Sequence, residues 1–461
     1  MLALIVAGET VFVLPFVVAR VLRTTFLSVF GLSNLQLGSA FSVYGIVAML
    51  SYFLGGPLAD RYAARVLISA ALAATAAGGL LFATIPSITS LALLYGFWGM
   101  TSILLFWAAL IRATRVWGGD ASQGRAYGIL DGGRGLLAAL LASATVVLFA
   151  HLLPADVASA TPLQRRAALQ EIILICSAFT LLAALLAWWI LPPRALRAAD
   201  DLAASIKGIR VAAKLPGVWL QALIIVSAYV AYKATDNFGL YAHDVLGFDE
   251  VAAARLGTIS FWTRPFAALL TGLLADRISG SRALIVGFAV LATGALVLAL
   301  DLLPMSVPTL LIATVITTSL GIYGVRGVYY AVMGEARVPL SVTGSAVGLV
   351  SVIGYTPDVF AGALFGWLLD RDPGAAGHHH VFLTVAGFAV IGILASIGLR
   401  LLSPLPPGEG GPKGRVRASP AQGGLISERP SPLTPLPEGE GNPGPAGRLL
   451  SEAMRATRMP A

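Results

Sequence analysis

The segment Gly56-Pro57-Leu58-Ala59-Asp60-Arg61 recurs further along the chain as Gly272-Leu273-Leu274-Ala275-Asp276-Arg277. Each copy ends an apolar run, and about half of the apolar part of the chain separates them, so the sequence predicts two related halves. The glycine permits close helix packing, and the Asp-Arg pair makes charge contacts at a helix end. A single copy could be an interfacial charge cluster, but two copies at matching places favour loops whose contacts form in one conformation and break in another. We expect this gating role for Gly56, Asp60, Arg61, Gly272, Asp276 and Arg277.

The amino-acid composition is that of a membrane protein. Hydrophobic residues make up 57% of the chain and charged residues only 12%, whereas an ordinary soluble domain carries about 25% charged residues. The net charge of +8 alone would suit a nucleic-acid binder, but the basic residues lie in short runs between apolar segments, where membrane topology explains them. We therefore expect contact with a lipid bilayer and no nucleic-acid partner. The single cysteine, Cys176, excludes a disulfide framework and a thiolate zinc site, and neither a metal nor a cofactor is expected.

Apolar runs long enough to cross a membrane occur twelve times. A helix needs about 20 residues to cross a hydrocarbon layer of about 30 Å. The predicted spans lie near residues 2–27, 37–58, 66–85, 89–111, 127–150, 170–191, 217–240, 254–274, 282–303, 308–332, 341–369 and 381–401. Because lipid does not tolerate unpaired backbone polar groups and these runs lack the alternation of barrel strands, the sequence predicts an all-α membrane protein.

The distribution of basic residues predicts the orientation of these spans. Arginine and lysine gather in the loops after every second span, and few occur in the opposite loops. The bases on the rich side include Arg61, Arg65, Arg112, Arg115, Arg125, Arg194, Arg197, Lys207, Arg210, Lys214, Arg277 and Arg282. The positive-inside rule therefore predicts an inner-membrane protein with both termini in the cytoplasm. No cleavable signal peptide is expected, because no basic segment precedes the first apolar run.

With its G-x-L-A-D-R loop in both halves, the sequence resembles the major facilitator superfamily over about residues 1–402. The resemblance implies two six-helix bundles related by a pseudo-twofold axis, a central cavity lined mainly by spans 1, 4, 7 and 10, alternating access and monomeric function. We expect an N-terminal bundle at 1–191, a cytoplasmic loop at 192–216 and a C-terminal bundle at 217–402. Residues 403–461 are too rich in proline and glycine for a packed core, so a disordered tail is predicted there.

Charged residues inside the spans are the candidate functional residues, because an ionisable group in the bilayer is costly. Arg20 and Arg23 lie three residues apart in span 1, hence on one helix face. Lys233 lies near the middle of span 7. Structural roles are the alternative for each of these groups. The span 1 arginines could reach the headgroups, Asp131 could pair with Arg134, Asp236 with Lys233, and Arg326 with Asp358.

Within the superfamily, these charges resemble the organophosphate and organic-anion branch. Arg23-Thr24-Thr25-Phe26 is similar to an R-x-x-F stretch in span 1, and Lys233 falls where a second basic residue, usually arginine, would be. The resemblance places Arg134 where some members use a histidine. Lysine at 233 lacks the bidentate fork that suits phosphate, and Tyr52 stands where phosphate-transporting members have a lysine. A carboxylate or sugar acid is therefore favoured over a phosphate ester. The implied substrate-binding residues are Arg20, Arg23, Arg134, Lys233 and Tyr355.

Proton symport is the coupling that an inside-negative membrane potential favours for an imported anion. Carboxylates within the spans could carry the proton, and the candidates are Asp131, Asp236 and Asp358. Glu9 and Glu335 are less favoured, because they lie near the predicted membrane boundaries. The run His378-His379-His380 is placed in the outer loop before span 12.

Other functional classes have weaker support. The sequence has no H-E-x-x-H motif and no P-loop, so neither an enzyme nor an ATP-driven pump is expected. A drug or neutral-solute exporter of the same fold remains an alternative, in which the intramembrane bases would be structural. A transporter-like sensor without flux is the second alternative.

Overall fold

The computed structural model describes residues 1–118, 123–193, 208–302, 304, 307–339 and 342–402. Within these ranges the chain is helical and contains no strand. The predicted tail at 403–461 and most of the predicted central loop at 192–216 lie outside the described residues, and the predicted division at these boundaries stays a prediction.

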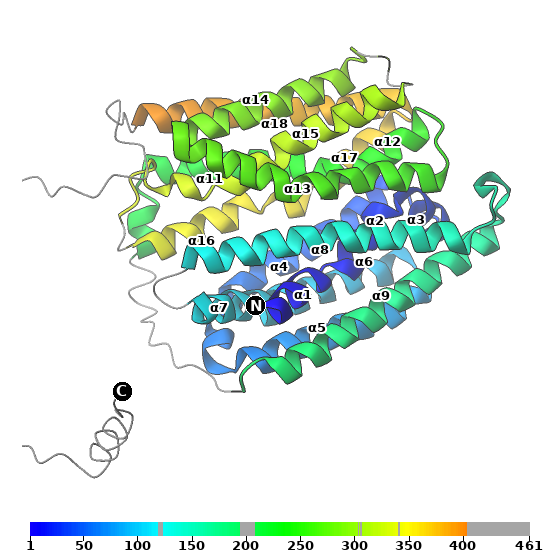
Figure 1. Cartoon of the computed structure of the whole chain (residues 1–461), viewed down its shortest axis with the longest axis horizontal. Helices are drawn as coiled ribbons and strands as arrows, with labels where there is room; N and C mark the ends of the chain where they lie inside the picture. Colours follow the sequence, from blue (N-terminus) through cyan, green and yellow to red (C-terminus); the bar gives the residue numbers. More distant parts are fainter. Residues whose placement is uncertain (119–122, 194–207, 303, 305–306, 340–341, 403–461) are drawn as a thin grey trace, which may run out of the picture. The chain divides into compact units, whose positions relative to one another are not determined.

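The helices of the first half of the chain correspond to the first six predicted spans, and Figure 1 shows their arrangement. The first of them is broken into four pieces, and the fourth changes from an α-helix to a wider π-helix and back. The elements are α1 (Leu2–Thr10), η1 (Val13–Val17), α2 (Val18–Val21), α3 (Arg23–Phe30), α4 (Asn34–Arg61), α5 (Ala64–Ala83), α6 (Ile88–Gly99), η2 (Met100–Trp107), α7 (Ala108–Gly118), α8 (Gln123–Leu152) and α9 (Pro162–Ile190).

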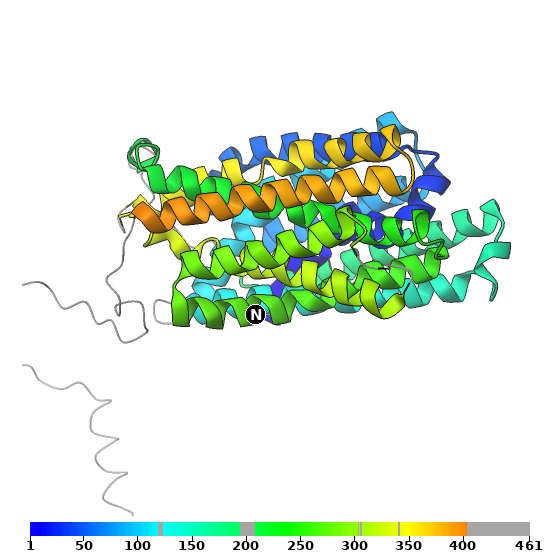
Figure 2. The same ribbon diagram turned by 90° about the horizontal axis from the view of Figure 1, so that it is seen from above.

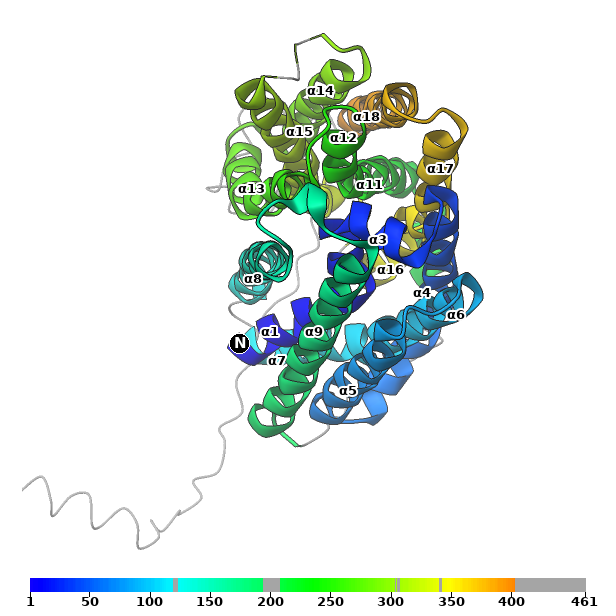
Figure 3. The same cartoon turned by 90° about the vertical axis from the view of Figure 1, so that its right-hand side faces the viewer.

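The second half repeats this organisation. In Figure 2 the helices of both halves run side by side along one common direction, and in Figure 3, an end-on view, the two bundles lie next to one another. The elements are α11 (Pro216–Ala234), η4 (Thr235–Asn237), α12 (Phe238–Asp244), α13 (Glu250–Ile278), α14 (Gly280–Ala299), α15 (Pro308–Val328), α16 (Thr343–Gly354), α17 (Pro357–Arg371) and α18 (Ala375–Leu402).

The predicted spans agree with these helices. Among the described residues, 10 helices are long and apolar enough to cross a membrane, and the bent pair α1 and Val13–Val21 forms a further span. Helix α13 completes the twelve predicted crossings, since its 29 residues extend about 43 Å. Arg264 and Pro265, near its middle, lower its hydropathy. The all-α fold class is confirmed.

The first span differs from the single regular helix that the spacing of its arginines assumed. Pro15 lies in the π-helical segment, and the backbone leaves helical geometry at Leu22 (φ −105°, ψ 35°). Arg20 and Arg23 therefore belong to different helical pieces, and the prediction that they share one helix face is wrong. The histidine run was also misplaced, because His378, His379 and His380 lie within α18 rather than in a loop.

Close backbone packing joins the two halves at the end of the bundle that the arginine distribution predicts to be outer. Helices α4 and α17 touch there through glycines, and a Cβ atom built on Gly38 would lie 2.1 Å from the carbonyl oxygen of Gly362. The Asp370 carboxylate accepts hydrogen bonds from the backbone nitrogens of Asn34 (3.0 Å) and Leu35 (2.7 Å). It therefore satisfies free N–H groups at the start of a helix in the other half.

The repeated hexapeptides lie at the opposite end and are loosely surrounded. No described atom lies within 4 Å of a Cβ atom built on Gly56 or on Gly272, so the expectation of close helix packing at these glycines is wrong for this conformation. The first copy contacts α7, because Arg112 donates a hydrogen bond to the carbonyl oxygen of Ala59. Arg61, Asp276 and Arg277 are exposed, and the Asp60 side chain is not among the described ones. The gating role of these residues stays a prediction.

The glycine contact predicts a stability difference between two alanine variants. Gly38→Ala should destabilise the protein by about 1–3 kcal/mol, because the added methyl group overpacks the α4–α17 contact. Gly387→Ala is the matched control, since nothing lies within 4 Å of its Cβ position. Thermal unfolding of the purified proteins in detergent measures both, and a Gly38→Ala variant as stable as the control would contradict the described packing.

Candidate functional site

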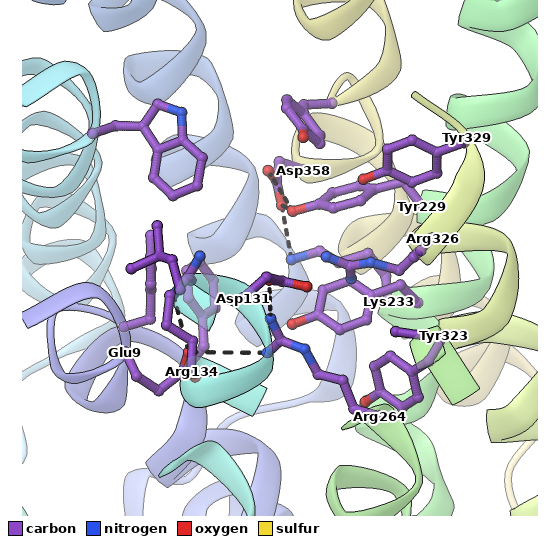
Figure 4. A pocket seen from close by; sticks show the side chains of 18 of the residues that line it. Glu9, Asp131, Arg134, Tyr229, Lys233, Arg264, Tyr323, Arg326, Tyr329 and Asp358 are labelled. Carbon is purple, nitrogen blue, oxygen red and sulfur yellow. Dashed lines mark hydrogen bonds and ion pairs between the residues drawn. The ribbon is translucent and has the colours of Figure 1, made fainter. Parts of the chain in front are cut away.

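A central cavity of about 380 Å³ lies between the two halves. Its walls include residues from the predicted spans 1, 4, 7 and 10, but also from spans 2, 5, 8 and 11, so the lining is broader than expected. The lining residues are Glu9, Phe12, Phe16, Val17, Arg20, Tyr44, Tyr52, Ile103, Trp107, Ile111, Tyr127, Leu130, Asp131, Arg134, Tyr229, Tyr232, Lys233, Phe261, Arg264, Ala268, Tyr323, Arg326, Gly327, Tyr329, Tyr330, Tyr355 and Asp358. Figure 4 shows the charged groups facing one another across this space.

Tyrosine is concentrated in the wall of the cavity. Of the 12 tyrosines in the chain, Tyr44, Tyr52, Tyr127, Tyr229, Tyr232, Tyr323, Tyr329, Tyr330 and Tyr355 line it. The predicted site residue Tyr355 is among them. Its hydroxyl accepts a hydrogen bond from Tyr330 (3.2 Å), and its ring lies 5.1 Å from that of Tyr229, centroid to centroid. Each tyrosine offers an apolar ring face and a polar hydroxyl to whatever occupies the cavity.

Lys233 is held by Asp358. The Lys233 Nζ lies 2.9 Å from Asp358 Oδ1, and the hydroxyl of Tyr229 donates to the same carboxylate at 3.1 Å. The ammonium group also lies 4.8 Å from the centre of the Phe16 ring. Two predicted pairings are therefore wrong, because Asp358 pairs with Lys233 rather than Arg326, and Asp236 does not neutralise Lys233.

Arg20 of the first half forms an ion pair with Asp236 of the second half. Its guanidinium donates to the carboxylate of Asp236 and to the hydroxyl of Tyr232 (3.1 Å). It also stacks on the ring of Tyr232, with 4.8 Å between the guanidinium carbon and the ring centre. The side chain is buried, so the alternative that Arg20 reaches the headgroups is wrong.

Arg23 is the predicted site residue that the structure does not bring to the central cavity. Its side chain is buried and its Nη2 donates to Asn34 Oδ1 at 3.0 Å. It belongs to the helical piece after the break at Leu22 and lines a second, much smaller pocket together with Lys233 and Asp236. A direct contact between Arg23 and a substrate in the cavity is therefore not supported.

Four charged residues from both halves form a second network. Arg264 Nη2 lies 2.9 Å from Asp131 Oδ1, and Glu9 Oε2 lies 3.5 Å from Arg134 Nε and 3.9 Å from Arg264 Nη1. Arg134 Nε donates a hydrogen bond to the carbonyl oxygen of Gly8 (3.0 Å). The alternative of an Asp131–Arg134 pair is therefore wrong, because each of them pairs with another element.

Two residues of this network differ from the prediction: Arg264 was not selected from the sequence, and Glu9 was expected near a membrane boundary. Arg264 lies in the middle of span 8, so the rule that selected the other intramembrane charges applied to it as well. Glu9 was placed near a membrane boundary by assuming a straight first span. The break after Thr10 instead leaves its side chain in the cavity wall with 7% exposure.

Arg326 differs from the other cations that line the cavity. Among the described residues, no carboxylate lies within 4.0 Å of its guanidinium, and its buried Nη1 has no hydrogen-bond partner. Its guanidinium carbon lies 3.7 Å from the centre of the Tyr232 ring and 5.5 Å from that of Tyr229. The tyrosines hold the guanidinium by cation–π contacts but leave its positive charge uncompensated by an anion.

The charges of the cavity sum to an excess of one positive charge in the described structure. The lining cations are Arg20, Arg134, Lys233, Arg264 and Arg326, and the facing carboxylates are Glu9, Asp131, Asp236 and Asp358. Four of the cations have a carboxylate partner, which leaves the charge of Arg326. This arrangement suits the binding of a negatively charged group.

Two bundles of membrane-spanning helices around a polar central cavity define a membrane transporter. The family model described as Major Facilitator Superfamily matches residues 2–362, and the chain belongs to this superfamily. This confirms the family resemblance, and the family consists of transporters rather than enzymes.

Two curated relatives come from Escherichia coli (strain K12). The inner membrane protein YqcE is 28% identical over 374 residues, which cover 79% of this chain and 85% of the relative. The inner membrane protein YihN is 27% identical over 379 residues, covering 80% and 87%. These relatives and the apolar spans place the chain in the inner membrane as a multi-pass protein.

Solved structures share the fold at low sequence identity. The nucleoside transporter NupG superposes with a TM-score of 0.65 at 14% identity, over 86% of this chain and 98% of the other. A bacterial homolog to the human lysosomal transporter Spinster, in an inward-facing and unoccupied conformation, superposes with a TM-score of 0.65 at 15% identity, over 87% and 96%.

The Lys233–Asp358 pair predicts a non-additive pair of variants. Lys233→Ala should lower the free energy of unfolding by about 3 kcal/mol, because it leaves a carboxylate without its cation in a low-dielectric wall. The double variant Lys233→Ala/Asp358→Ala should recover most of this loss. Thermal unfolding in detergent measures the effect, and a double variant no more stable than Lys233→Ala would show that the two groups do not pair.

Proposed function

We propose that this transporter moves a small organic anion, a sugar acid or another carboxylate, across the inner membrane by alternating access coupled to protons. The observation that supports this proposal is the state of Arg326, the lining cation without a carboxylate partner among the described residues. A buried cation without a counter-ion is costly, and an anionic substrate would supply the missing charge.

Arg326 is suited to a carboxylate by its geometry. A guanidinium presents a planar fork of donors that matches a carboxylate in two parallel hydrogen bonds. Stacking on Tyr232 fixes the plane of this fork, and its Nη1 has no other acceptor. We therefore assign the direct anion contact to Arg326. The predicted contacts Arg20, Arg134 and Lys233 are instead proposed to shape the site through their ion pairs.

The tyrosines favour a hydroxylated substrate over a plain aliphatic acid. Their ring faces pack against the apolar faces of a sugar, and their hydroxyls donate to and accept from its hydroxyl groups. Tyr355 belongs to this group, as the sequence predicted. A cavity of about 380 Å³ is within the range of small-molecule sites.

One uncompensated charge suits a monovalent anion. Import of such an anion against an inside-negative potential costs about 2.3 kcal/mol per 100 mV. Uptake of one proton with each anion makes the transported charge zero and removes this cost. A pH gradient then drives accumulation by about tenfold per pH unit, independently of the potential.

The described conformation is proposed to open to the cytoplasm. Contacts between the halves gather at the predicted outer end, where Arg165 Nε lies 2.7 Å from Glu250 Oε1 and α4 packs on α17. The hexapeptides at the other end are loosely surrounded. Exchange with an outward-open state would require the contacts at the predicted outer end to separate.

A neutral hydroxylated solute is the second candidate. The pairing of four cations with carboxylates and the tyrosine-rich wall favour it, and the nucleoside transporter NupG shares the fold. In that case the Arg326 charge would be stabilised by the tyrosine rings alone.

Uptake by proteoliposomes distinguishes these candidates. A radiolabelled panel of hexonates, hexuronates, dicarboxylates, glycerol phosphates and nucleosides is offered with and without an inward proton gradient. We expect saturable uptake of a monovalent sugar acid that the gradient increases. Arg326→Gln should lower this uptake about 100-fold, because the substrate loses a charge-assisted contact worth about 2–5 kcal/mol, and Arg326→Lys should retain part of it.

The matched control is Arg255→Gln, which removes an exposed arginine of α13 outside the cavity and should transport like the wild type. Uptake of a nucleoside but of no anion would reject the anion assignment. Binding without uptake in any gradient would favour a sensor.

A further inference from the structure

Glu9 differs from the other carboxylates around the cavity in its hydrogen bonding. Its Oε2 is buried and has no hydrogen-bond partner in the part of the chain that the structure describes, and its distances of 3.5 Å and 3.9 Å to Arg134 and Arg264 exceed hydrogen-bond length. The two arginines direct their hydrogen bonds elsewhere. Arg134 donates to the Gly8 carbonyl oxygen and Arg264 to Asp131. Glu9 is thus held by charge alone.

The three carboxylates that the sequence favoured as proton carriers are bound more tightly. Asp236 accepts from Arg20, Asp358 from Tyr229 and Lys233, and Asp131 from Arg264. Adding a proton to any of them breaks or weakens a charge-assisted hydrogen bond, which is about twice as strong as a neutral one. Adding a proton to Glu9 breaks none, and both arginines keep their present acceptors.

We propose that Glu9 is the proton-binding site of the transport cycle, an inference that rests on the proposed anion transport. The Glu9 carboxylate and a substrate anion would draw on the same positive charges, since Arg264 contacts Glu9 and lines the cavity with Arg326. A proton from water that forms an O–H bond on Glu9 leaves the positive charges of Arg134 and Arg264 to stabilise, without direct contact, the anion that Arg326 binds. By linkage, bound anion favours the protonated Glu9 to the same degree. On the other side the O–H bond breaks, and the proton returns to water.

The position of Glu9 links proton binding to the contact between the two halves. Glu9 lies on α1 in the first half, and Arg264 lies on α13 in the second. Neutralising Glu9 therefore weakens one of the charge contacts between the halves at the cavity (Figure 4). Asp131 still holds Arg264, so the link is weakened rather than lost.

The elements that pack on α1 are η1, α5, α7, α8 and α9. Of their ionisable groups, Arg134, Asp131 and Tyr127 of α8 line the cavity, and Arg264 of α13 and Arg326 of α15 line it from the other half. The remaining ionisable residues of the elements packed on α1 do not line the cavity: Arg65 of α5, Arg112 and Arg115 of α7, Arg125 and His151 of α8, and Arg165, Arg166, Glu171 and Cys176 of α9. The permanent charges that contact Glu9 are thus the two arginines whose positive potential would also stabilise a substrate anion.

Glu9→Gln tests the proposal in the full chain, with D-glucuronate as the probe in proteoliposomes. The wild type should accumulate D-glucuronate down a proton gradient by about tenfold per pH unit. The Glu9→Gln variant should exchange D-glucuronate at a rate independent of pH and should not accumulate it. Glu9→Asp keeps a titratable group and should restore gradient-driven accumulation. Asp131→Asn is the matched control, since it neutralises the other carboxylate facing Arg264, and it should slow exchange while keeping the pH dependence.

Infrared difference spectroscopy tests the proton site without a substrate. Acidification of the wild type should produce the C=O band of a protonated carboxyl group that is absent in Glu9→Gln and present in Asp131→Asn. If this band appears but the protein transports no anion, the assignment of Glu9 as the proton-binding site would stand and the proposed substrate class would be rejected. A band or a gradient-driven accumulation that persists in Glu9→Gln would overturn the assignment of Glu9.

Discussion

Charge compensation inside a low-dielectric wall is the constraint on which this cavity depends. A charged side chain buried between membrane helices is tolerated when an opposite charge lies beside it. Lys233 has Asp358 at 2.9 Å, Arg20 has Asp236, and Arg264 has Asp131 at 2.9 Å. These pairs fix the rotation of the helices that carry them, and so they determine which surfaces the cavity presents.

Two kinds of contact join the halves, and they respond differently to a bound ion. At the predicted outer end the contact is steric, because glycines of α4 and α17 bring two backbones together. At the cavity it is electrostatic, through Arg20–Asp236 and the group around Arg264. Binding of a proton or an anion would change the electrostatic contact directly but would leave the steric contact unchanged. In the proposed transport cycle, substrate and proton would therefore act at the cavity, while the glycine contact would close one end of it.

Much of the fold was predictable from local properties of the sequence. The length of each apolar run determines that a helix crosses the bilayer, and the two hexapeptides that begin at Gly56 and Gly272 indicate the repeat. Intramembrane position selected Arg20, Arg134 and Lys233, and the family resemblance selected Tyr355; all four residues line the cavity. Intramembrane position also selected Arg23, which belongs to the helical piece after the break at Leu22 and does not line the central cavity. Residue spacing does not reveal such a break in a helix.

The sequence by itself determined the number of crossings, the twofold organisation and the presence of buried charges, because these follow from hydropathy and from residue type. Only the tertiary structure decided which charges pair. Asp358 lies against Lys233 and not Arg326, and Glu9 lies between two arginines of distant helices. The partner of a buried charge depends on the rotation and tilt of helices far apart in the chain, and spacing along one helix does not encode them. Because Asp358 pairs with Lys233, Arg326 has no carboxylate partner among the residues that the structure describes.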